Sequence, residues 1–560
     1  MEQIQETLKS AVEKLFGVEV EPLVTVAPEN TGADYASNIA MQLAKLVHKA
    51  PMVIAEMIKS ELAERNIEVM IAAPGFLNFQ ANKDAMTMQV KNYAGDLVSE
   101  IEDSAYAEKT VVAEFSDPNP FKVLHVGHLY TSVVGDSISR LLEFAGAKVV
   151  RANFGGDVGL HVAKTLYWLE NRLDNATFLD TMTIEDVATC YVEGTRAYEE
   201  DPLAKEKITK LNKEIYRINS EDLHDSDLAK LYWRGRELSY EYFENFYAQI
   251  GVKFDKYYPE SSVAGRGLQE VKAHTGTTYE ESNGAIVYKG EKVDLHTRVF
   301  INREGVPTYE AKDVGLIFTK WDDWHFDESI VVTGNEQSDY MKVVLASVSE
   351  YAPQLVERTT HLTHGLVKLP GNVKMSSRKG NFLKAVDVLQ MVRENLSVVS
   401  NGTKTVDERI VLAAIKYAFL KYKMGGDIVF DPQESVSMTG NSGVYLLYSA
   451  VRAKKILQNV GEEKFESDEE KLKAEKVFEQ KLCKKILQYK DVLGGAVKEK
   501  APYKVCTYLY ELSQEFSRFY EHVKVAGNRR ESELKQVVRA YLNVMLHGLG
   551  LLGIEVPDEM

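Results

Sequence analysis

The stretch TVVAEFSDPNPFKVLHVGHLYTSVVGDSISRLLEFAGAKVVRA, residues 110–152, indicates the fold class of the chain. It begins with an apolar run rich in β-branched residues, 110–115, which stops before the breaker Pro118-Asn119-Pro120. A long helical pattern follows, and residues 148–152 form a second strand pattern. Strand, loop, helix and strand in this order are the unit of a parallel α/β sheet. Ligands of such sheets bind beyond the carboxyl ends of the strands, so we expect a functional site at the Pro-Asn-Pro loop and the residues after it.

The patterns along the whole chain predict three domains. Residues 1–105 mix helical and strand patterns without the spacing of a catalytic site, so we expect an appended α+β domain there. Residues 106–403 are expected to form a Rossmann-like parallel sheet with helices on both faces, interrupted by a largely helical insertion at about 165–290. Residues 404–560 are almost entirely helical in pattern.

Composition excludes several classes of protein. The 560 residues are 45% hydrophobic and 27% charged, which is typical of a folded globular chain rather than a disordered one. No stretch approaches the roughly 18 apolar residues that span a bilayer, and the N-terminal sequence lacks the pattern of a secretory signal. The scattered cysteines Cys190, Cys483 and Cys506 form neither a disulfide framework nor a zinc cluster. We therefore expect a cytoplasmic protein with no membrane contact and no metal site of its own.

Charge is unevenly distributed along the chain. The net charge is −16, which argues against general adhesion to nucleic acid. Residues 404–560, however, hold 25 Lys+Arg against 23 Asp+Glu, a net of +2, so the preceding residues carry −18. A near-neutral helical region on an acidic body permits local basic faces, although a simple solvated helical module has the same balance.

Two histidines stand at the start of the predicted helix, in His125-Val126-Gly127-His128. Residues three apart face the same side of a helix, and backbone N–H groups with the positive end of the helix dipole favour phosphate there. Gly127 is expected to let a nucleotide approach the backbone. Imidazoles at this place are suited to donate hydrogen bonds to phosphate oxygens whose charge grows during reaction. A metal-binding pair and ordinary helix histidines are the alternatives.

A second motif, Lys374-Met375-Ser376-Ser377-Arg378-Lys379-Gly380, follows Pro370 and Gly371 and is expected to lie on a loop. Ammonium and hydroxyl groups on a loop that closes suit a pyrophosphate leaving group. Taken alone, the motif is equally typical of a basic surface turn.

Together, the histidine pair and the Lys-Met-Ser-Ser loop resemble the two signatures of class I aminoacyl-tRNA synthetases. The resemblance extends over nearly the whole chain to the arginyl-tRNA synthetases, in blocks 114–128, 307–313, 334–337 and 374–380. The segments at 37–45 and 73–76 look like that family's N-terminal domain, which touches the tRNA elbow. The segments at 445–453 and 551–557 look like its helical anticodon-binding domain.

The resemblance implies a ligase of protein biosynthesis that attaches L-arginine to tRNA(Arg). The arginine carboxylate attacks the α-phosphate of ATP, and the resulting arginyl-adenylate passes its arginyl group to the 2′-hydroxyl of the terminal adenosine. The partners implied are ATP, L-arginine and tRNA(Arg), with Mg2+ arriving on ATP, and we expect a monomer. The family assigns catalysis to Lys122, His125, His128 and Lys374. It assigns ATP binding to His125, Gly127, His128, Lys374, Met375, Ser376 and Ser377.

The residues of the expected site also meet the physical requirement for recognising arginine. A guanidinium has five donors and no acceptor, so selective recognition needs carboxylates in a fixed arrangement. Glu114 at the strand end and Asp313, with Tyr309 one helical turn before it, offer acceptors. By resemblance, Asn119 and Gln337 also hold the amino acid.

Two departures from the family pattern matter. Position 377 is Ser377, where the general class I loop has a second lysine, and in the arginyl subclass a lysine before the histidine pair, here Lys122, is thought to replace it. The segment Asn153–Gly159 keeps Gly156 and Asp157 but has Phe154 and Val158 where His and Trp are more usual, so no role is assigned to it.

Two other functions share these motifs. One is a small-molecule nucleotidyltransferase, for which the terminal domains would have no use. The other is a non-catalytic tRNA-binding or regulatory paralogue, against which His125, His128 and Lys374 argue.

Overall fold

The computed structural model describes residues 2–28, 31–65, 67–80, 83–172, 178–371, 383–399, 406–459 and 469–560. The Lys374–Gly380 motif, with Lys374, Met375, Ser376 and Ser377, lies outside these residues. The chain divides into two compact units, Met1–Asn92 and Tyr93–Met560. The first unit therefore ends earlier than the domain boundary expected near residue 105.

The first unit is an α+β fold, as the sequence predicts. Its antiparallel sheet has the order β1-β2-β4-β3, formed by Val24–Val26, Tyr35–Ser37, Phe76–Phe79 and Val69–Ala72. Three helices pack on it: α1 (Glu2–Phe16), α2 (Ile39–Val47) and α3 (Pro51–Glu64). Pro51 occupies the first turn of α3, where its missing N–H costs no helical hydrogen bond.

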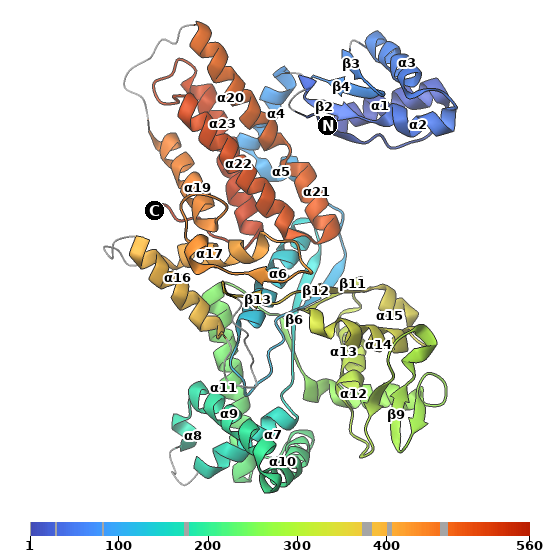
Figure 1. Cartoon of the computed structure of the whole chain (residues 1–560), viewed down its shortest axis with the longest axis vertical. Helices are drawn as coiled ribbons and strands as arrows, with labels where there is room; N and C mark the ends of the chain where they lie inside the picture. The colour runs from blue at the N-terminus through green and yellow to red at the C-terminus, as the bar shows by residue number, and fades with distance from the viewer. Residues whose placement is uncertain are drawn as a thin grey trace. The chain divides into compact units, whose positions relative to one another are not determined.

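The second unit is built around a five-stranded parallel sheet of order β12-β11-β5-β6-β7 (Figure 1). The strands are Thr359–His364, Glu328–Gly334, Thr110–Glu114, Lys148–Gly155 and Lys256–Pro259. Val111, Val112 and Ala113 of the central strand are buried, because helices cover both faces of the sheet. The chain leaves β5 toward β6 on one side, while β11 pairs with β5 on the other. The gap between β5 and β11 is thus the topological switch point, where ligands of open α/β sheets bind.

Helix α6 (Val126–Phe144) follows β5 and is buried along most of its length. The C-terminal helices that contact it are α16 (Ala385–Val399), α17 (Glu408–Leu420), α21 (Tyr489–Glu499), α22 (Pro502–His522) and α23 (Glu531–Leu551). Helices α19 (Gly443–Gln458) and α20 (Glu469–Leu487) pack in turn on α22 and α23. Ser137 donates a hydrogen bond to the carbonyl of Leu551 at 3.1 Å, and the buried Lys416 ammonium donates to the carbonyl of Gly553 at 2.6 Å. The helix that begins at the histidine pair is therefore held by the C-terminal bundle.

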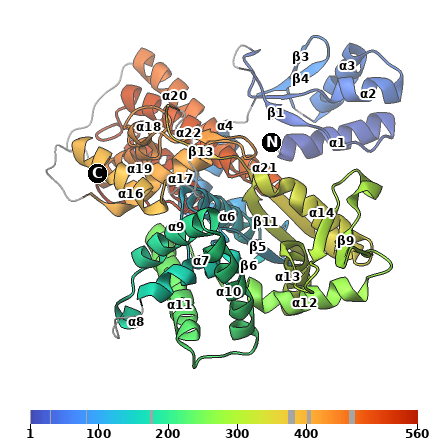
Figure 2. The same cartoon turned by 60° about the horizontal axis from the view of Figure 1, so that its bottom comes forward.

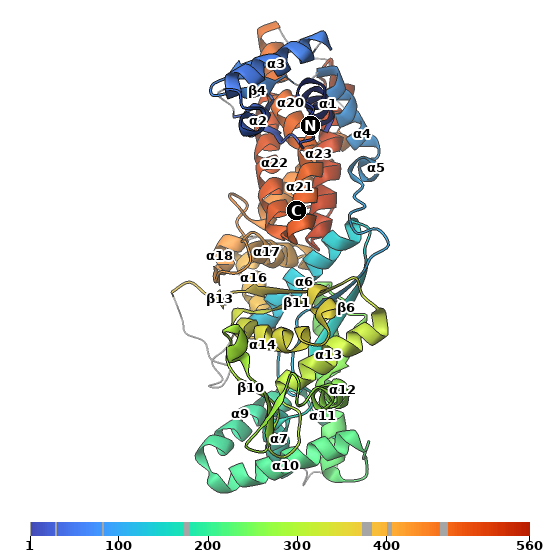
Figure 3. The same cartoon turned by 90° about the vertical axis from the view of Figure 1, so that its right-hand side faces the viewer.

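Two excursions leave the sheet on the side away from the bundle (Figures 1 and 3). The first is helical: α7 (Leu160–Leu169), α8 (Phe178–Thr181), α9 (Ile184–Glu200), α10 (Pro202–Ser220) and α11 (Asp227–Ile250). The chain then returns to the sheet as β7. The second comprises α12 (Glu260–Ala273), the antiparallel sheet β8 (Glu280–Ser282), β9 (Ala285–Tyr288) and β10 (Arg298–Ile301), α13 (Tyr309–Trp324), and, after β11, α14 (Ser338–Ser349) and α15 (Pro353–Glu357).

These excursions correct the expected insertion at about 165–290. Strand β7 lies inside that range, yet it pairs in parallel with β6 of the main sheet. Its sequence, Lys256-Tyr257-Tyr258-Pro259, lacks an aliphatic run because it forms the edge of the sheet. Figure 2 shows the helical excursion and the α12–α14 layer as neighbouring groups, which meet where Tyr216 of α10 contacts Lys312 of α13. No helix in the described ranges is long and apolar enough to cross a membrane.

Candidate active site

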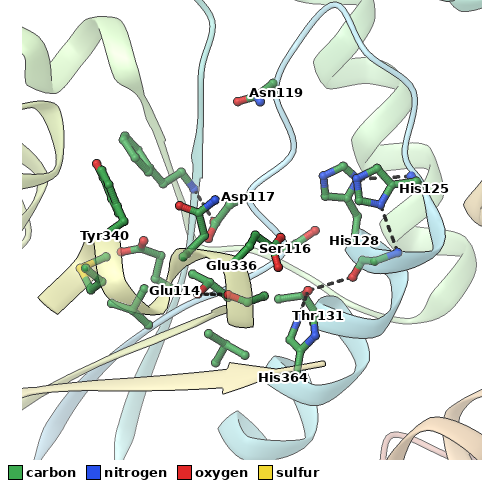
Figure 4. A pocket seen from close by; sticks show the side chains of 18 of the residues that line it. Glu114, Ser116, Asp117, Asn119, His125, His128, Thr131, Glu336, Tyr340 and His364 are labelled. Carbon is green, nitrogen blue, oxygen red and sulfur yellow. Dashed lines mark hydrogen bonds between the residues drawn. The ribbon is translucent and has the colours of Figure 1, made fainter. Parts of the chain in front are cut away.

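A cavity of about 1160 Å³ opens at the switch point of the sheet. Its walls come from the residues after β5, the start of α6, the first turns of α12 and α13, and the loop after β11. Of the residues expected in the site, those that line it are Glu114, Asn119, His125, Gly127, His128, Tyr309, Asp313 and Gln337. Figure 4 shows the two imidazoles at the start of α6 on one side, with Glu114, Asp117 and Tyr340 opposite. The tertiary structure thus brings together lining residues as far apart in the chain as Glu114 and Leu383.

The histidine pair caps its own helix. The His125 Nδ1 accepts a hydrogen bond from the Gly127 N–H at 3.1 Å, and the His128 Nδ1 accepts from the His125 N–H at 3.2 Å. The Val126 N–H donates to the carbonyl of Leu383 at 2.9 Å. These three backbone N–H groups, expected from the sequence to face phosphate, are therefore engaged within the protein. Because both Nδ1 atoms accept, each neutral ring carries its proton on Nε2, which is the donor the site offers.

Burial keeps both imidazoles neutral. The pKa of His125 is lowered to about 4 by burial and by the charge of Lys122, and the pKa of His128 is well below its usual range for the same reasons. The rings stack at 3.8 Å between centroids. Gly127 serves this stack: a Cβ there would lie 2.9 Å from the His125 ring, so the space expected for a nucleotide is taken by His125.

Lys122 lies beside the large cavity rather than in it. It lines a neighbouring cavity of about 290 Å³, whose walls include both histidines, Asn119 and Lys384. Its ammonium lies 5.0 Å from the ring centroid of Tyr191 on α9, a cation–π distance. The two cavities share Asn119 and the imidazoles, and the charge of Lys122 acts on both histidines and on Glu260.

Three carboxylates of the large cavity already have cationic partners. The Glu114 carboxylate accepts from Lys320 at 2.6 Å, and both residues are almost fully buried. The Glu260 carboxylate accepts from Lys312 at 2.6 Å. A third pair, Glu310 with Arg298, has an N–O distance of 3.2 Å. Each of these carboxylates is neutralised in the substrate-free protein.

Asp313 differs from these three. Its carboxylate accepts a hydrogen bond from the Tyr340 hydroxyl and forms no ion pair with any described residue. Burial, with the charges of Glu114 and Glu260, raises the pKa of Asp313 to about 8. The pKa of Asp117 is also raised well above its usual range by burial and by Glu114. A cation that enters this cavity therefore meets two carboxyl groups without an ion-pair partner among the described residues: Asp313, and Asp117, which accepts from the Phe154 N–H at 2.8 Å.

Asn119 has a fixed amide orientation. Its Oδ1 accepts from the Gly156 N–H at 2.8 Å, so the amide NH₂ is the end available to another group. A Cβ at Gly156 would lie 2.8 Å from Asn119 Oδ1 and 3.0 Å from Glu260 Oε1. His161 Nε2 donates to the Gly156 carbonyl at 2.7 Å and fixes the same peptide from its other side.

Asp157 anchors the next helix of the site. Its buried carboxylate accepts from Arg236 at 2.9 Å and from the N–H and hydroxyl of Ser261 at 3.0 and 2.7 Å. Ser261 directly follows Glu260 at the start of α12. The segment Asn153–Gly159, for which no role is expected from the sequence, therefore positions both Asn119 and Glu260.

Sequence reasoning missed several lining residues. Glu260 was hidden because β7, which precedes it, lacks the apolar pattern of a core strand. Tyr340 and Lys320 lie at ordinary helical positions, and no local pattern distinguishes them from surface residues. A buried lysine seven residues after Asp313, and thus on the same helix face, was the one available signal.

The sequence matches three family models. Residues 95–432 match the catalytic domain of class I tRNA synthetases (R), residues 446–560 the DALR anticodon binding domain, and residues 2–81 the arginyl tRNA synthetase N-terminal domain. The catalytic model extends past the boundary expected at 403. Arginine–tRNA ligases of Clostridium botulinum (strain Langeland) and Clostridium acetobutylicum are 29% and 27% identical to the chain. The matches cover 97% and 99% of this chain, and 96% and 100% of those proteins.

Solved structures share the fold. The arginyl-tRNA synthetase of Thermus thermophilus superimposes with a TM-score of 0.79 at 22% identity, covering 100% of both chains. That of Plasmodium falciparum gives 0.73 at 20% identity, covering 100% of this chain and 99% of that one. The family model of the catalytic domain alone matches residues 95–432, which is more than half of this chain. The chain therefore belongs to the class I arginyl-tRNA synthetases.

Proposed function

We propose that the large cavity activates L-arginine with ATP and then transfers the arginyl group to tRNA(Arg). The observation that carries this assignment is the placement of Asp313, a buried carboxyl group without a cationic partner among the described residues, in the same cavity as two imidazole donors at the start of α6. The carboxyl group suits a guanidinium, and the imidazoles suit a phosphate.

The arginine side chain is assigned to the α13 side of the cavity. Asp313 takes the guanidinium, with Tyr309 beside it one turn earlier on the same helix. Glu114, held by Lys320, and Gln337 at the end of β11 line the same cavity. The Asn119 amide NH₂, fixed by Gly156, is placed to donate to the amino acid's carboxylate. This arrangement directs one carboxylate oxygen toward the histidine side.

In the first step, that oxygen attacks the α-phosphate of ATP and pyrophosphate leaves. His125 and His128 donate through Nε2 to phosphate oxygens as negative charge grows on them. Neutral donors keep their protons throughout the step, so the imidazoles act as hydrogen-bond donors rather than acids. Gly127 contributes by making room for the His125 ring.

Cationic stabilisation of the phosphates is assigned to Lys122 and Lys374. Lys122 lines the neighbouring cavity, whose walls include both imidazoles, so it is assigned to the pyrophosphate that leaves. Lys374, Met375, Ser376 and Ser377 are assigned to the same phosphates on the resemblance of their motif alone. Mg2+ is assigned to ATP, because magnesium at nucleotide sites is held mainly by phosphates and water.

The terminal regions are assigned to tRNA(Arg). We divide the chain at about 105 and about 403, with anticodon recognition in 404–560 and a further tRNA contact in 1–105. We propose that the chain acts as a monomer. A cytoplasmic location is supported by the three cysteines, which are buried and form no disulfide, as fits a reducing compartment.

Charging of total tRNA with each of the twenty amino acids tests the function. We expect arginine alone to be attached, in an ATP-dependent reaction that weakens as salt rises, because tRNA contacts release counterions. Attachment of another amino acid contradicts the arginine assignment. Adenylate formation without any tRNA charging indicates a small-molecule nucleotidyltransferase, and the absence of both indicates a non-catalytic paralogue.

A further inference from the structure

The ammonium group of Lys312 lies in a buried cage that is suited to a cation. Its Nζ donates to the Glu260 carboxylate at 2.6 Å and to the Tyr216 hydroxyl at 3.0 Å. The same atom lies 5.4 Å from the ring centroid of Tyr216 and 5.2 Å from that of Tyr309. One carboxylate and two tyrosine rings attract an ammonium both as an ion pair and through cation–π contacts. We call these three residues the Glu260 cage.

The cage borders the proposed arginine site. Glu260 and Tyr309 both line the large cavity, and Lys312 immediately precedes Asp313 on α13. The charge of Glu260 acts on the Asp313 carboxyl group, which places the two within electrostatic range. The third member, Tyr216, comes from α10 of the helical excursion, so the cage is completed only when that excursion packs against α13.

Lys312 is itself buried, at 3% exposure, with Glu260 at 4%. The contacts of its ammonium with a carboxylate, a hydroxyl and two rings stabilise Lys312 in this position. The cage is therefore occupied by the chain's own lysine, whose terminal group is chemically the same as that of free L-lysine.

We propose that Lys312 is a specificity-determining residue that fills the Glu260 cage and so denies it to the ammonium of a competing substrate such as L-lysine. With Glu260 occupied, a substrate cation must bind at Asp313, where a planar guanidinium offers several donors and an ammonium offers a single compact charge. Specificity for arginine over lysine then has two sources: the Glu260 cage excludes the lysine ammonium, and Asp313 accepts the arginine guanidinium. This inference rests on the proposed arginine pocket.

Lys312→Ala tests it, because the variant empties the cage and leaves Glu260 in place. Activation of L-arginine and L-lysine is measured by ATP–pyrophosphate exchange with tRNA present, on the full chain. We expect the ratio of kcat/KM for arginine over lysine to fall roughly tenfold or more. Lys312→Arg, which keeps a cation in the cage, is expected to stay closer to the parent ratio. The double variant Lys312→Ala with Glu260→Gln is expected to lose the gain in lysine activation, since the cage then has no carboxylate.

A binding measurement makes the test independent of activity. n-Propylammonium replaces the lost atoms of the lysine side chain, so it should raise the Tm of Lys312→Ala but not that of the parent or the double variant. If Lys312→Ala folds only when n-propylammonium is present, that rescue is itself the expected binding. A folded Lys312→Ala with the parental ratio and no response to n-propylammonium overturns the proposal. A parent enzyme that fails to activate arginine at all refutes the proposed function instead.

Discussion

The hydroxyl group of Tyr340 on α14 donates a hydrogen bond to the carboxylate of Asp313 on α13, 27 residues earlier in the chain. The guanidinium carbon of Arg298 also lies over the Tyr340 ring, 5.3 Å from the ring centroid. The tyrosine thus contacts both Asp313 and Arg298, while the Arg298 guanidinium forms its ion pair with Glu310 rather than with Asp313. In this way Asp313 stays available to a cation from outside the protein.

Arginine binding is expected to release a proton from Asp313. In the substrate-free protein the pKa of Asp313 is about 8, against an ordinary value of 3.8, so the group is largely protonated at neutral pH. A guanidinium favours the ionised carboxylate, so the affinity for arginine should rise with pH toward about 8, by at most roughly tenfold per pH unit. Calorimetry in buffers of different ionisation enthalpy measures the protons released.

Asp313→Asn is the control for this release. The variant should bind arginine with a lower affinity, by roughly 2–5 kcal/mol, and with a weaker pH dependence. Some dependence should remain, because the pKa of Asp117 is raised in the same direction. Equal proton release by the parent and the Asn variant would remove Asp313 from the guanidinium site.

The same shift predicts how stability depends on pH. Between the unfolded pKa near 3.8 and the folded pKa of about 8, the folded state binds more protons at Asp313 than the unfolded state does. The free energy of unfolding of the substrate-free protein should therefore fall as pH rises through this window, by up to about 1.4 kcal/mol per pH unit from this group. Denaturant titrations of the parent and Asp313→Asn at several pH values check this slope.

Lys122→Ala should lower the rate of arginine activation by a factor on the order of 10² or more, with a much smaller effect on ATP binding. The reason is that the ammonium interacts most strongly with charge that develops in the transition state. Pre-steady-state adenylate formation and equilibrium ATP binding separate the two effects. A lysine placed at position 377 in this variant should recover part of the rate. Parental turnover by Lys122→Ala would assign the missing charge to another residue, with Arg378 or Lys379 to be tested next.

Gly156→Ala should weaken arginine binding without a comparable effect on ATP. The new Cβ would press on Asn119 Oδ1 and Glu260 Oε1, at 2.8 and 3.0 Å, and so displace both side chains. We expect the KM for arginine to rise roughly tenfold or more. Gly265→Ala on α12, where a Cβ meets nothing within 4 Å, is the matched control and should leave this KM unchanged. Similar KM values for both variants would contradict the positioning role of Gly156.

Lys320→Met should destabilise the protein by roughly 3–5 kcal/mol, because it leaves the Glu114 carboxylate buried and unpaired. Lys342→Met is the surface comparison. It removes an ion pair with Asp339 in which both side chains are more than half exposed, and it should cost less than about 1 kcal/mol. Chemical denaturation of both variants gives the two values, and similar losses would show that the buried pair contributes no more than the exposed one.

The sequence by itself determined the parallel strands β5 and β6, the helix that follows β5 and the presence of the histidine pair, because these depend on local periodicity and on short motifs. It also placed Glu114, Asn119, Tyr309, Asp313 and Gln337, all of which line the cavity. The residues that correct or complete this site come from distant segments. Glu260 is reached only through the edge strand β7, and Tyr340 only through the packing of α14 on α13.

Only the tertiary structure decided how charge is arranged in the cavity. The sequence shows carboxylates and lysines without their partners, since an ion pair such as Glu114 with Lys320 joins residues 206 positions apart. Packing also decided that the N–H groups at the start of α6 serve the histidine rings, which turns neutral imidazole Nε2 atoms into the donors. Local patterns report which groups are present, whereas burial and pairing, which are long-range, determine their charge and availability.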